Sequence, residues 1–106
     1  MVHQYQGNYS YNQSTITGWN NSQIGVYYCG SILQDGSLSP LYIGKATGQD
    51  GIKGRLLQHL NQDNWPGVTH FGYCVCDTTK EAEDLESAEI AKYQPKYNTQ
   101  GKTTSY

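Results

Sequence analysis

Two short apolar runs of the chain each carry a tyrosine, and a lysine closes the second run. The first run is Gly-Val-Tyr at 25–27 and the second is Tyr-Ile-Gly-Lys at 42–45, and glycine, serine and proline occur between them at 36–40. Apolar runs separated by such turn-forming residues predict neighbouring antiparallel strands joined by a hairpin. The pairing brings two phenols close to an ammonium group, and such groups can relay a proton or contact a phosphate.

A cationic pair lies on the segment that follows these strands. Apolar residues at helical spacing predict a helix over 51–61, and Arg55 and His59 project from the same face of it because they are four residues apart. A guanidinium suits a pentacovalent phosphate, since it donates hydrogen bonds in a fixed fork and stays charged. Lys45 and Lys53 extend the pair into a local basic cluster. In isolation, an arginine and a histidine at this spacing are more often a solvated helix face.

A carboxylate lies on the apolar face of the last predicted helix. Thr78 followed by Glu81 is a capping-box signature, so this helix is expected to run from Thr78 to about Tyr93. Glu86 and Glu89 both fall within the arc of its apolar residues. Burying an unpaired charge is costly, and a bound cation would offset that cost. A salt bridge from Glu86 to the lysine or the arginine, or a position at the rim of the apolar face, would offset it as well.

The whole ordered set resembles the GIY-YIG nuclease domain. Its parts are the two tyrosine runs, the helical Arg55, the helical Glu86 and the stretch Tyr-Gln-Pro-Lys-Tyr-Asn at 93–98. Together they cover roughly 24–98, about 70% of the chain. The set looks closest to the incision domain of bacterial excision repair and to small free-standing members of the family. One departure is Val26, which replaces isoleucine and is a conservative change in a strand.

The resemblance implies a metal-dependent DNA endonuclease. It implies that Glu86, which matches the family glutamate by its distance to the proline, holds one Mg²⁺ or Mn²⁺ ion, whereas Glu89 does not match. It implies that Arg55 stabilises the phosphorane and that His59 occupies a position that is histidine in some members and tyrosine in others. The products implied are a 5′-phosphate and a 3′-hydroxyl, with one strand cut at a time.

The two motif tyrosines are expected to share the activation of the attacking water. An unperturbed phenol, with a pKa of about 10, is a poor base at neutral pH, although a nearby lysine can lower that pKa. We expect Tyr42 to act as the base, Tyr27 to position the water, and Lys45 to assist the phenol or the phosphate. The expected substrate-binding residues are Gly44, Lys53 and Asn98.

The predicted elements form an α+β fold of order β-β-α-β-α, in which helices flank a small three-stranded antiparallel sheet. The expected strands cover 24–29, 41–44 and 68–77, and Pro95 ends the last helix.

The chain is expected to hold one domain at 23–98 between two polar ends. Residues 1–22 contain almost no aliphatic side chains, so we expect a flexible or loosely docked extension. Alternatively, its tyrosines and tryptophan stack on bases or pack over the domain. Residues 99–106 are expected to form a polar tail.

The composition restricts how the chain can meet nucleic acid. The formal net charge is −2, so phosphate recognition requires a local basic patch. The resemblance implies DNA as the substrate, and the low charge favours a partner protein or a homodimer for targeting or double-strand cleavage. A non-catalytic nucleic-acid-binding or adaptor module that retains the fold is the alternative.

Three cysteines, an odd number, argue against a secreted disulfide scaffold. Cys74 and Cys76 would face the same way from one strand, and their spacing lacks the Cys-x-x-Cys pattern of zinc sites. We favour buried free thiols over a zinc site, and a cytoplasmic location. No secretory signal or membrane-spanning stretch is predicted.

Overall fold

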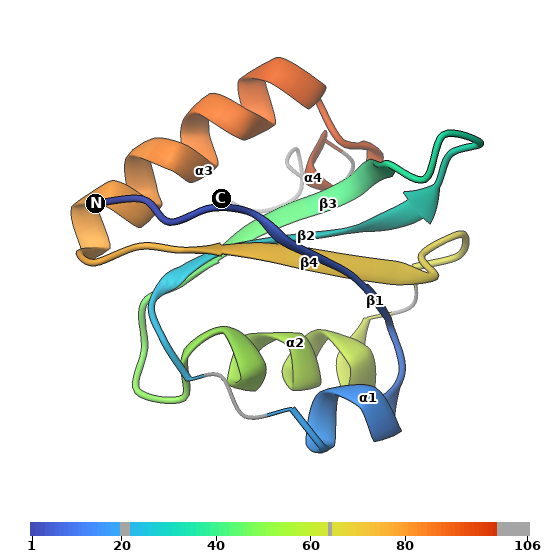
Figure 1. Cartoon of the computed structure of the whole chain (residues 1–106), viewed down its shortest axis with the longest axis horizontal. Helices are drawn as coiled ribbons and strands as arrows, with labels where there is room; N and C mark the ends of the chain where they lie inside the picture. Colours follow the sequence, from blue (N-terminus) through green and yellow to red (C-terminus); the bar gives the residue numbers. More distant parts are fainter. Residues whose placement is uncertain (20–21, 64, 100–106) are drawn as a thin grey trace.

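A four-stranded antiparallel sheet forms the centre of the computed structural model, which describes residues 1–19, 22–63 and 65–99 (Figure 1). The strands are β1 (Gln6–Ser10), β2 (Gly25–Ile32), β3 (Leu38–Ala46) and β4 (His70–Val75), in the spatial order β1-β4-β2-β3. The helices are α1 (Gln13–Thr17), α2 (Gly51–Gln62), α3 (Thr79–Tyr93) and α4 (Lys96–Thr99). The predicted α+β class is confirmed, but the sheet has four strands where three were predicted.

The predicted hairpin of two tyrosine runs is formed by β2 and β3. These strands pair antiparallel, with Tyr27 opposite Gly44 and Cys29 opposite Tyr42, so both tyrosines lie on the same face of the sheet. The turn includes Gly36 at φ 88°, a backbone conformation that favours glycine. The hairpin thus places the second tyrosine run on β3, the strand at one edge of the sheet.

Alternation along β2 divides the apolar side chains between two helical layers. Tyr27 and Cys29 pack on one face with residues of α1 and α2, whereas Val26 and Tyr28 pack on the other face with residues of α3. Figure 1 shows α3 on one side of the sheet and α1 with α2 on the other. Side chains from both helical layers can therefore meet only at an edge of the sheet, and β3 is such an edge.

The N-terminal segment is part of the sheet, which corrects the expectation of a flexible or loosely docked extension. β1 pairs antiparallel with β4, Ile16 of α1 is fully buried, and Asn12 caps that helix by accepting a hydrogen bond from the Thr15 N–H. Trp19 packs against the rings of Phe71 and Tyr73 of β4, with its ring centroid 5.5 Å and 5.0 Å from theirs. Aromatic rings thus supply most of the apolar contacts of this segment, which has few aliphatic side chains.

The predicted capping box of α3 is confirmed. The Thr78 hydroxyl accepts from the Glu81 N–H, and the Glu81 carboxylate accepts from the Thr78 N–H. The helix ends at Tyr93, and its C-cap residue Gln94 has φ 44° and precedes Pro95. The cap fixes where the helix begins, and hence which of its carboxylates reach the edge of the sheet.

The three thiols are buried, and Cys74 and Cys76 lie on the α3 face of the sheet, as their spacing predicts. Within the described residues, no helix is long and apolar enough to span a membrane. The predicted polar tail over 99–106 falls almost wholly outside the described residues.

Candidate active site

A pocket of about 290 Å³ opens at the edge of the sheet formed by β3. Tyr42 and Lys45 line it from β3, Arg55 from α2 and Glu86 from α3. Thr47 and Gly48, in the loop after β3, complete the lining. The fold therefore brings together four of the site residues that the sequence predicted, from three separate elements.

Two opposite charges pair within this pocket. The Lys45 ammonium nitrogen lies 3.6 Å from a carboxylate oxygen of Glu86, whose side chain is 20% exposed. The sequence allows Glu86 to form an ion pair with Lys45 or with Arg55, and the structure shows the pair with Lys45. The Arg55 guanidinium donates from Nη1 to the Gln58 side-chain oxygen at 2.6 Å. Ammonium, guanidinium and carboxylate thus surround one space large enough for a phosphate.

The two motif tyrosines differ in their access to the pocket. Tyr42 is half-buried and lines the pocket, whereas Tyr27 is fully buried and lies behind it, with ring centroids 6.2 Å apart. Burial raises the pKa of Tyr27 far above that of a free phenol. Burial also raises the pKa of Tyr42; the Arg55 guanidinium opposes this rise, and Glu86 adds to it. Tyr42 is therefore the phenol that borders the pocket, whereas Tyr27 has no access to it.

A chain of two hydrogen bonds continues from Tyr27 into α2. His59 Nε2 lies 2.8 Å from the Tyr27 hydroxyl, and His59 Nδ1 lies 2.6 Å from a carboxylate oxygen of Asp63. A carboxylate can only accept, so Nδ1 carries the hydrogen and Nε2 accepts from the Tyr27 hydroxyl. Burial lowers the pKa of His59, which the Asp63 carboxylate opposes, and the imidazole is therefore neutral at neutral pH.

Asp63 was not among the site residues predicted from the sequence. It follows His59 by four residues at the end of α2. Residues at this spacing on a helix lie close together, so the sequence does contain a signal for this contact. Its carboxylate fixes the tautomer and the orientation of the buried imidazole.

Trp65 was predicted only as part of a loop, but its ring covers the site. Its centroid lies 4.5 Å from that of Tyr42 in a stacked arrangement and 4.7 Å from that of His59. Tyr97 stacks against it at 6.0 Å. These rings pack over the side of the site where the Tyr27 and His59 side chains are buried.

Three residues expected to bind substrate, Gly44, Lys53 and Asn98, make contacts within the fold. A Cβ atom at Gly44 would lie 2.4 Å from the Tyr27 hydroxyl oxygen, so glycine makes room for the buried phenol. Lys53 donates to the Thr17 carbonyl at 3.2 Å, which ties α2 to α1, and it does not line the pocket.

Asn98 is the third of these residues, and it is buried with both ends of its amide engaged. It accepts from the Ile43 N–H at 2.7 Å and donates to the Ile43 carbonyl at 2.8 Å. The side chain thus pairs with the outer edge of β3 as a neighbouring strand would. Asn98 therefore positions the strand that carries Tyr42 and Lys45.

The donor set of the pocket fits a hard divalent cation that shares its coordination with a phosphate. Within the described residues, no group of three or more His, Cys, Asp or Glu side chains could hold a metal ion. Mg²⁺ and Mn²⁺ prefer oxygen ligands, and Mg²⁺ is often held by one or two carboxylates, with water and substrate phosphate completing the shell. The single carboxylate of Glu86 at an open pocket meets this requirement.

The chain is similar in sequence to part of two proteins named UvrABC system protein C. Over 83 residues, 70% of this chain, it is 39% identical to the protein from Caldanaerobacter subterraneus subsp. tengcongensis and 37% identical to that from Ruminiclostridium cellulolyticum. The matched region covers 12% of each relative, so the chain spans about an eighth of their length. No family model matches the chain.

Proposed function

We propose that this chain is a GIY-YIG-type, metal-dependent endonuclease domain that hydrolyses phosphodiester bonds in DNA. The observation that carries the proposal is the convergence of Tyr42, Lys45, Arg55 and Glu86 on one pocket at the β3 edge. The ordered motifs of the sequence and the similarity to UvrABC system protein C support the same family.

The hydrogen-bonded chain behind the pocket gives the attacking water a route for its proton. As the water attacks phosphorus, its proton passes to the Tyr42 oxygen and the Tyr42 proton passes to Tyr27. The Tyr27 proton then moves to His59 Nε2 over the 2.8 Å contact, and Asp63 stabilises the imidazolium that forms. No phenol needs to be ionised beforehand, which removes the difficulty that burial raises the pKa of both phenols.

The charged residues of the pocket supply the remaining requirements of the reaction. Arg55 and Lys45 donate to the non-bridging oxygens of the phosphate as negative charge grows on them. A Mg²⁺ or Mn²⁺ ion held by Glu86 would supply Lewis-acid stabilisation of the same charge. Breaking the bond to the 3′ oxygen leaves a 5′-phosphate and a 3′-hydroxyl. One such site cuts one strand per event, so double-strand cleavage requires a dimer or a second visit.

Targeting to DNA by a partner protein or through a homodimer is part of the proposal. The net charge of −2 gives the isolated chain little general attraction for a polyanion. We expect the isolated chain to bind DNA weakly and with a strong salt dependence. Tight binding of the isolated chain to one defined sequence would contradict this part of the proposal.

A plasmid-nicking assay with variants of α2 tests the proposal. Arg55→Ala should lower the rate of Mn²⁺-dependent nicking by roughly 10²-fold to 10³-fold, the scale of losing one preorganised donor to the transition state. Lys53→Ala removes a positive charge from the same helix outside the pocket and should nick within about threefold of wild type, as expected of a surface charge away from the chemistry. Equal rates for both variants would reject the proposed role of the pocket.

A non-catalytic nucleic-acid-binding module is the second candidate. The Lys45–Glu86 ion pair favours it, because the pair satisfies both charges without any ion. A titration with Mg²⁺ followed by NMR separates the two functions. Saturable shifts at Glu86 support the nuclease, and no shift there supports the binding module.

A further inference from the structure

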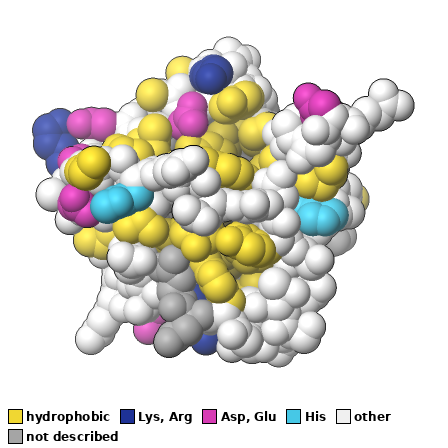
Figure 2. All heavy atoms as spheres, in the orientation of Figure 1, with side chains coloured by type: hydrophobic (Ala, Val, Ile, Leu, Met, Phe, Trp, Pro, Cys, Tyr) yellow, Lys and Arg dark blue, Asp and Glu magenta, His cyan; other side chains and the backbone are white. Residues whose placement is uncertain are grey.

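A second pocket, also of about 290 Å³, lies on the other face of the sheet, beneath α3. Hydrophobic side chains gather on this face of the molecule between α3 and the strands (Figure 2). Residues from the N-terminal segment, β2, the β2–β3 hairpin, β4 and α3 line it. None of them belongs to the candidate active site, and the mechanism proposed above leaves this pocket without a role.

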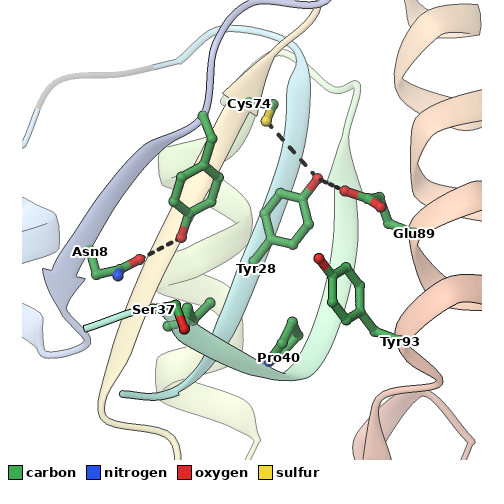
Figure 3. Close-up of a pocket in the computed structure, with 9 residues that line it drawn as sticks. Asn8, Tyr28, Ser37, Pro40, Cys74, Glu89 and Tyr93 are labelled. Atoms are coloured by element: carbon green, nitrogen blue, oxygen red, sulfur yellow. Dashed lines mark hydrogen bonds between the residues drawn. The ribbon is translucent and has the colours of Figure 1, made fainter. Parts of the chain in front are cut away.

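Three tyrosine rings form the walls of this pocket. Tyr5 and Tyr28 meet edge to face, with ring centroids 5.5 Å apart and an interplanar angle of 75°. Tyr93 of α3 lines the pocket as the third ring and is 44% exposed. Figure 3 shows Tyr28 beside Glu89, with Tyr93 below them. An edge-to-face pair sets the positive edge of one ring on the negative face of the other, and the exposed ring of Tyr93 adds a third π system to the lining.

One carboxylate accompanies the three rings. Glu89 accepts a hydrogen bond from the Tyr28 hydroxyl at 2.8 Å, and burial keeps that phenol protonated by raising its pKa (Figure 3). Among the described residues, the lining includes no lysine or arginine. Lys92 lies outside the lining, with its ammonium nitrogen 5.0 Å from the centroid of the Tyr93 ring. The ring of Tyr93 therefore already attracts an ammonium group.

We propose that this pocket binds an alkylated ammonium group. The faces of tyrosine rings attract a cation and also pack against its alkyl substituents. Glu89 balances the charge of such a ligand, and the same carboxylate disfavours phosphate and carboxylate ligands. The site is independent of the nuclease proposal, because it shares no residue with the pocket at the β3 edge.

A titration of the intact chain with choline, followed by NMR, tests this inference. Choline should shift the backbone signals of Glu89 and Tyr93 and saturate them. The control ligand is the neutral isostere of choline, in which carbon replaces the ammonium nitrogen, so that shape is kept and charge is lost. We expect the isostere to bind at least about fivefold more weakly, the scale of one cation–π contact. Equal binding of the two ligands, or no shift with choline at tens of millimolar, would overturn the inference.

Three variants of α3 locate the site. Glu89→Gln keeps an acceptor for the Tyr28 hydroxyl but loses the charge, and Tyr93→Leu keeps an apolar side chain but loses the ring. Each should weaken choline binding roughly fivefold, and the dispersion of the amide spectrum verifies that the variants are folded. Lys92→Gln is the matched control and should bind choline equally or more tightly, because it removes a like charge. Unchanged affinity in both of the first two variants would overturn the proposal.

A pair of peptides distinguishes the two sources of such a group. One peptide carries trimethyllysine and the other the unmodified lysine. Tighter binding of the trimethyllysine peptide than of choline would identify a modified protein tail as the ligand, and the reverse order would identify a small metabolite. Tighter binding of the unmodified peptide than of its methylated form would contradict the aromatic recognition proposed.

Discussion

Replacing Asp63 with asparagine tests the proton relay behind the pocket. The carboxylate accepts the Nδ1 hydrogen of His59 at 2.6 Å and so leaves Nε2 free to accept from Tyr27. An amide at this position can also donate to Nδ1, which would place the imidazole hydrogen on Nε2. That tautomer cannot take the Tyr27 proton. The substitution also removes the negative charge that raises the pKa of His59, so the imidazole becomes a weaker base.

The expected losses in rate and in stability for Asp63→Asn differ greatly. A general base contributes roughly 10²-fold to 10⁴-fold to a reaction, so we expect single-turnover nicking to slow by about 10²-fold or more. The Asp63 side chain is 43% exposed, so its hydrogen bond to the neutral imidazole adds about 1 kcal/mol to the free energy of unfolding. A large loss of rate with little loss of stability would separate a positioning role from a structural one.

The assay is single-turnover plasmid nicking, measured across the pH range in which histidine titrates. The wild-type rate should rise with pH as His59 loses its proton, with an inflection below pH 6.5 because burial lowers the pKa of this residue. Asp63→Asn should have a lower plateau and an inflection at still lower pH. The control is Asp50→Asn at the N-terminus of the same helix, where the carboxylate makes no capping hydrogen bond. A wild-type rate and pH profile in Asp63→Asn would refute the relay.

The remaining predictions concern stability. Asn98→Ala should lower the free energy of unfolding by about 2–3 kcal/mol, because it leaves the N–H and carbonyl of Ile43 without their partners. Urea denaturation measures this free energy, and a loss under about 0.5 kcal/mol would contradict the prediction. Gly44→Ala should cost roughly 2 kcal/mol through its clash with Tyr27, whereas Gly48→Ala, with nothing within 4 Å of the added Cβ, should be nearly neutral in the same measurement. The stability of the wild type should fall as the pH drops below 6.5, because His59 binds a proton less readily in the folded state than in the unfolded state. A free energy of unfolding that stays constant below pH 6.5 would contradict the lowering of the His59 pKa by burial.

Local patterns in the sequence predicted the elements that carry the candidate active site. The hairpin of β2 and β3 follows from two apolar runs around turn residues, and α3 follows from the capping box at Thr78. These signals lie within a few residues of the elements that they determine. The convergence of Tyr42, Lys45, Arg55 and Glu86 was therefore within reach of sequence reasoning, helped by a family resemblance.

The parts that sequence reasoning missed depend on contacts between distant residues. β1 is stabilised by tyrosine and tryptophan rings packed on β4, which a count of aliphatic residues does not reveal. Trp65 lies in an irregular loop, and only the tertiary fold places its ring on Tyr42 and His59. Nothing local in the sequence shows that the Asn98 amide meets Ile43, because 55 residues of chain separate the two.

The most direct test of the proposed function is nicking by Glu86→Gln in the presence of Mn²⁺. The amide keeps the size of the side chain but removes the charge that would hold the ion. Glu83→Gln, an exposed position on the same helix, is the matched control. We expect wild type and Glu83→Gln to nick only when Mn²⁺ is present, and Glu86→Gln to be slower by roughly 10³-fold. Wild-type-like nicking by Glu86→Gln, or nicking by the wild type after chelation of the metal, would contradict a metal-dependent site at Glu86.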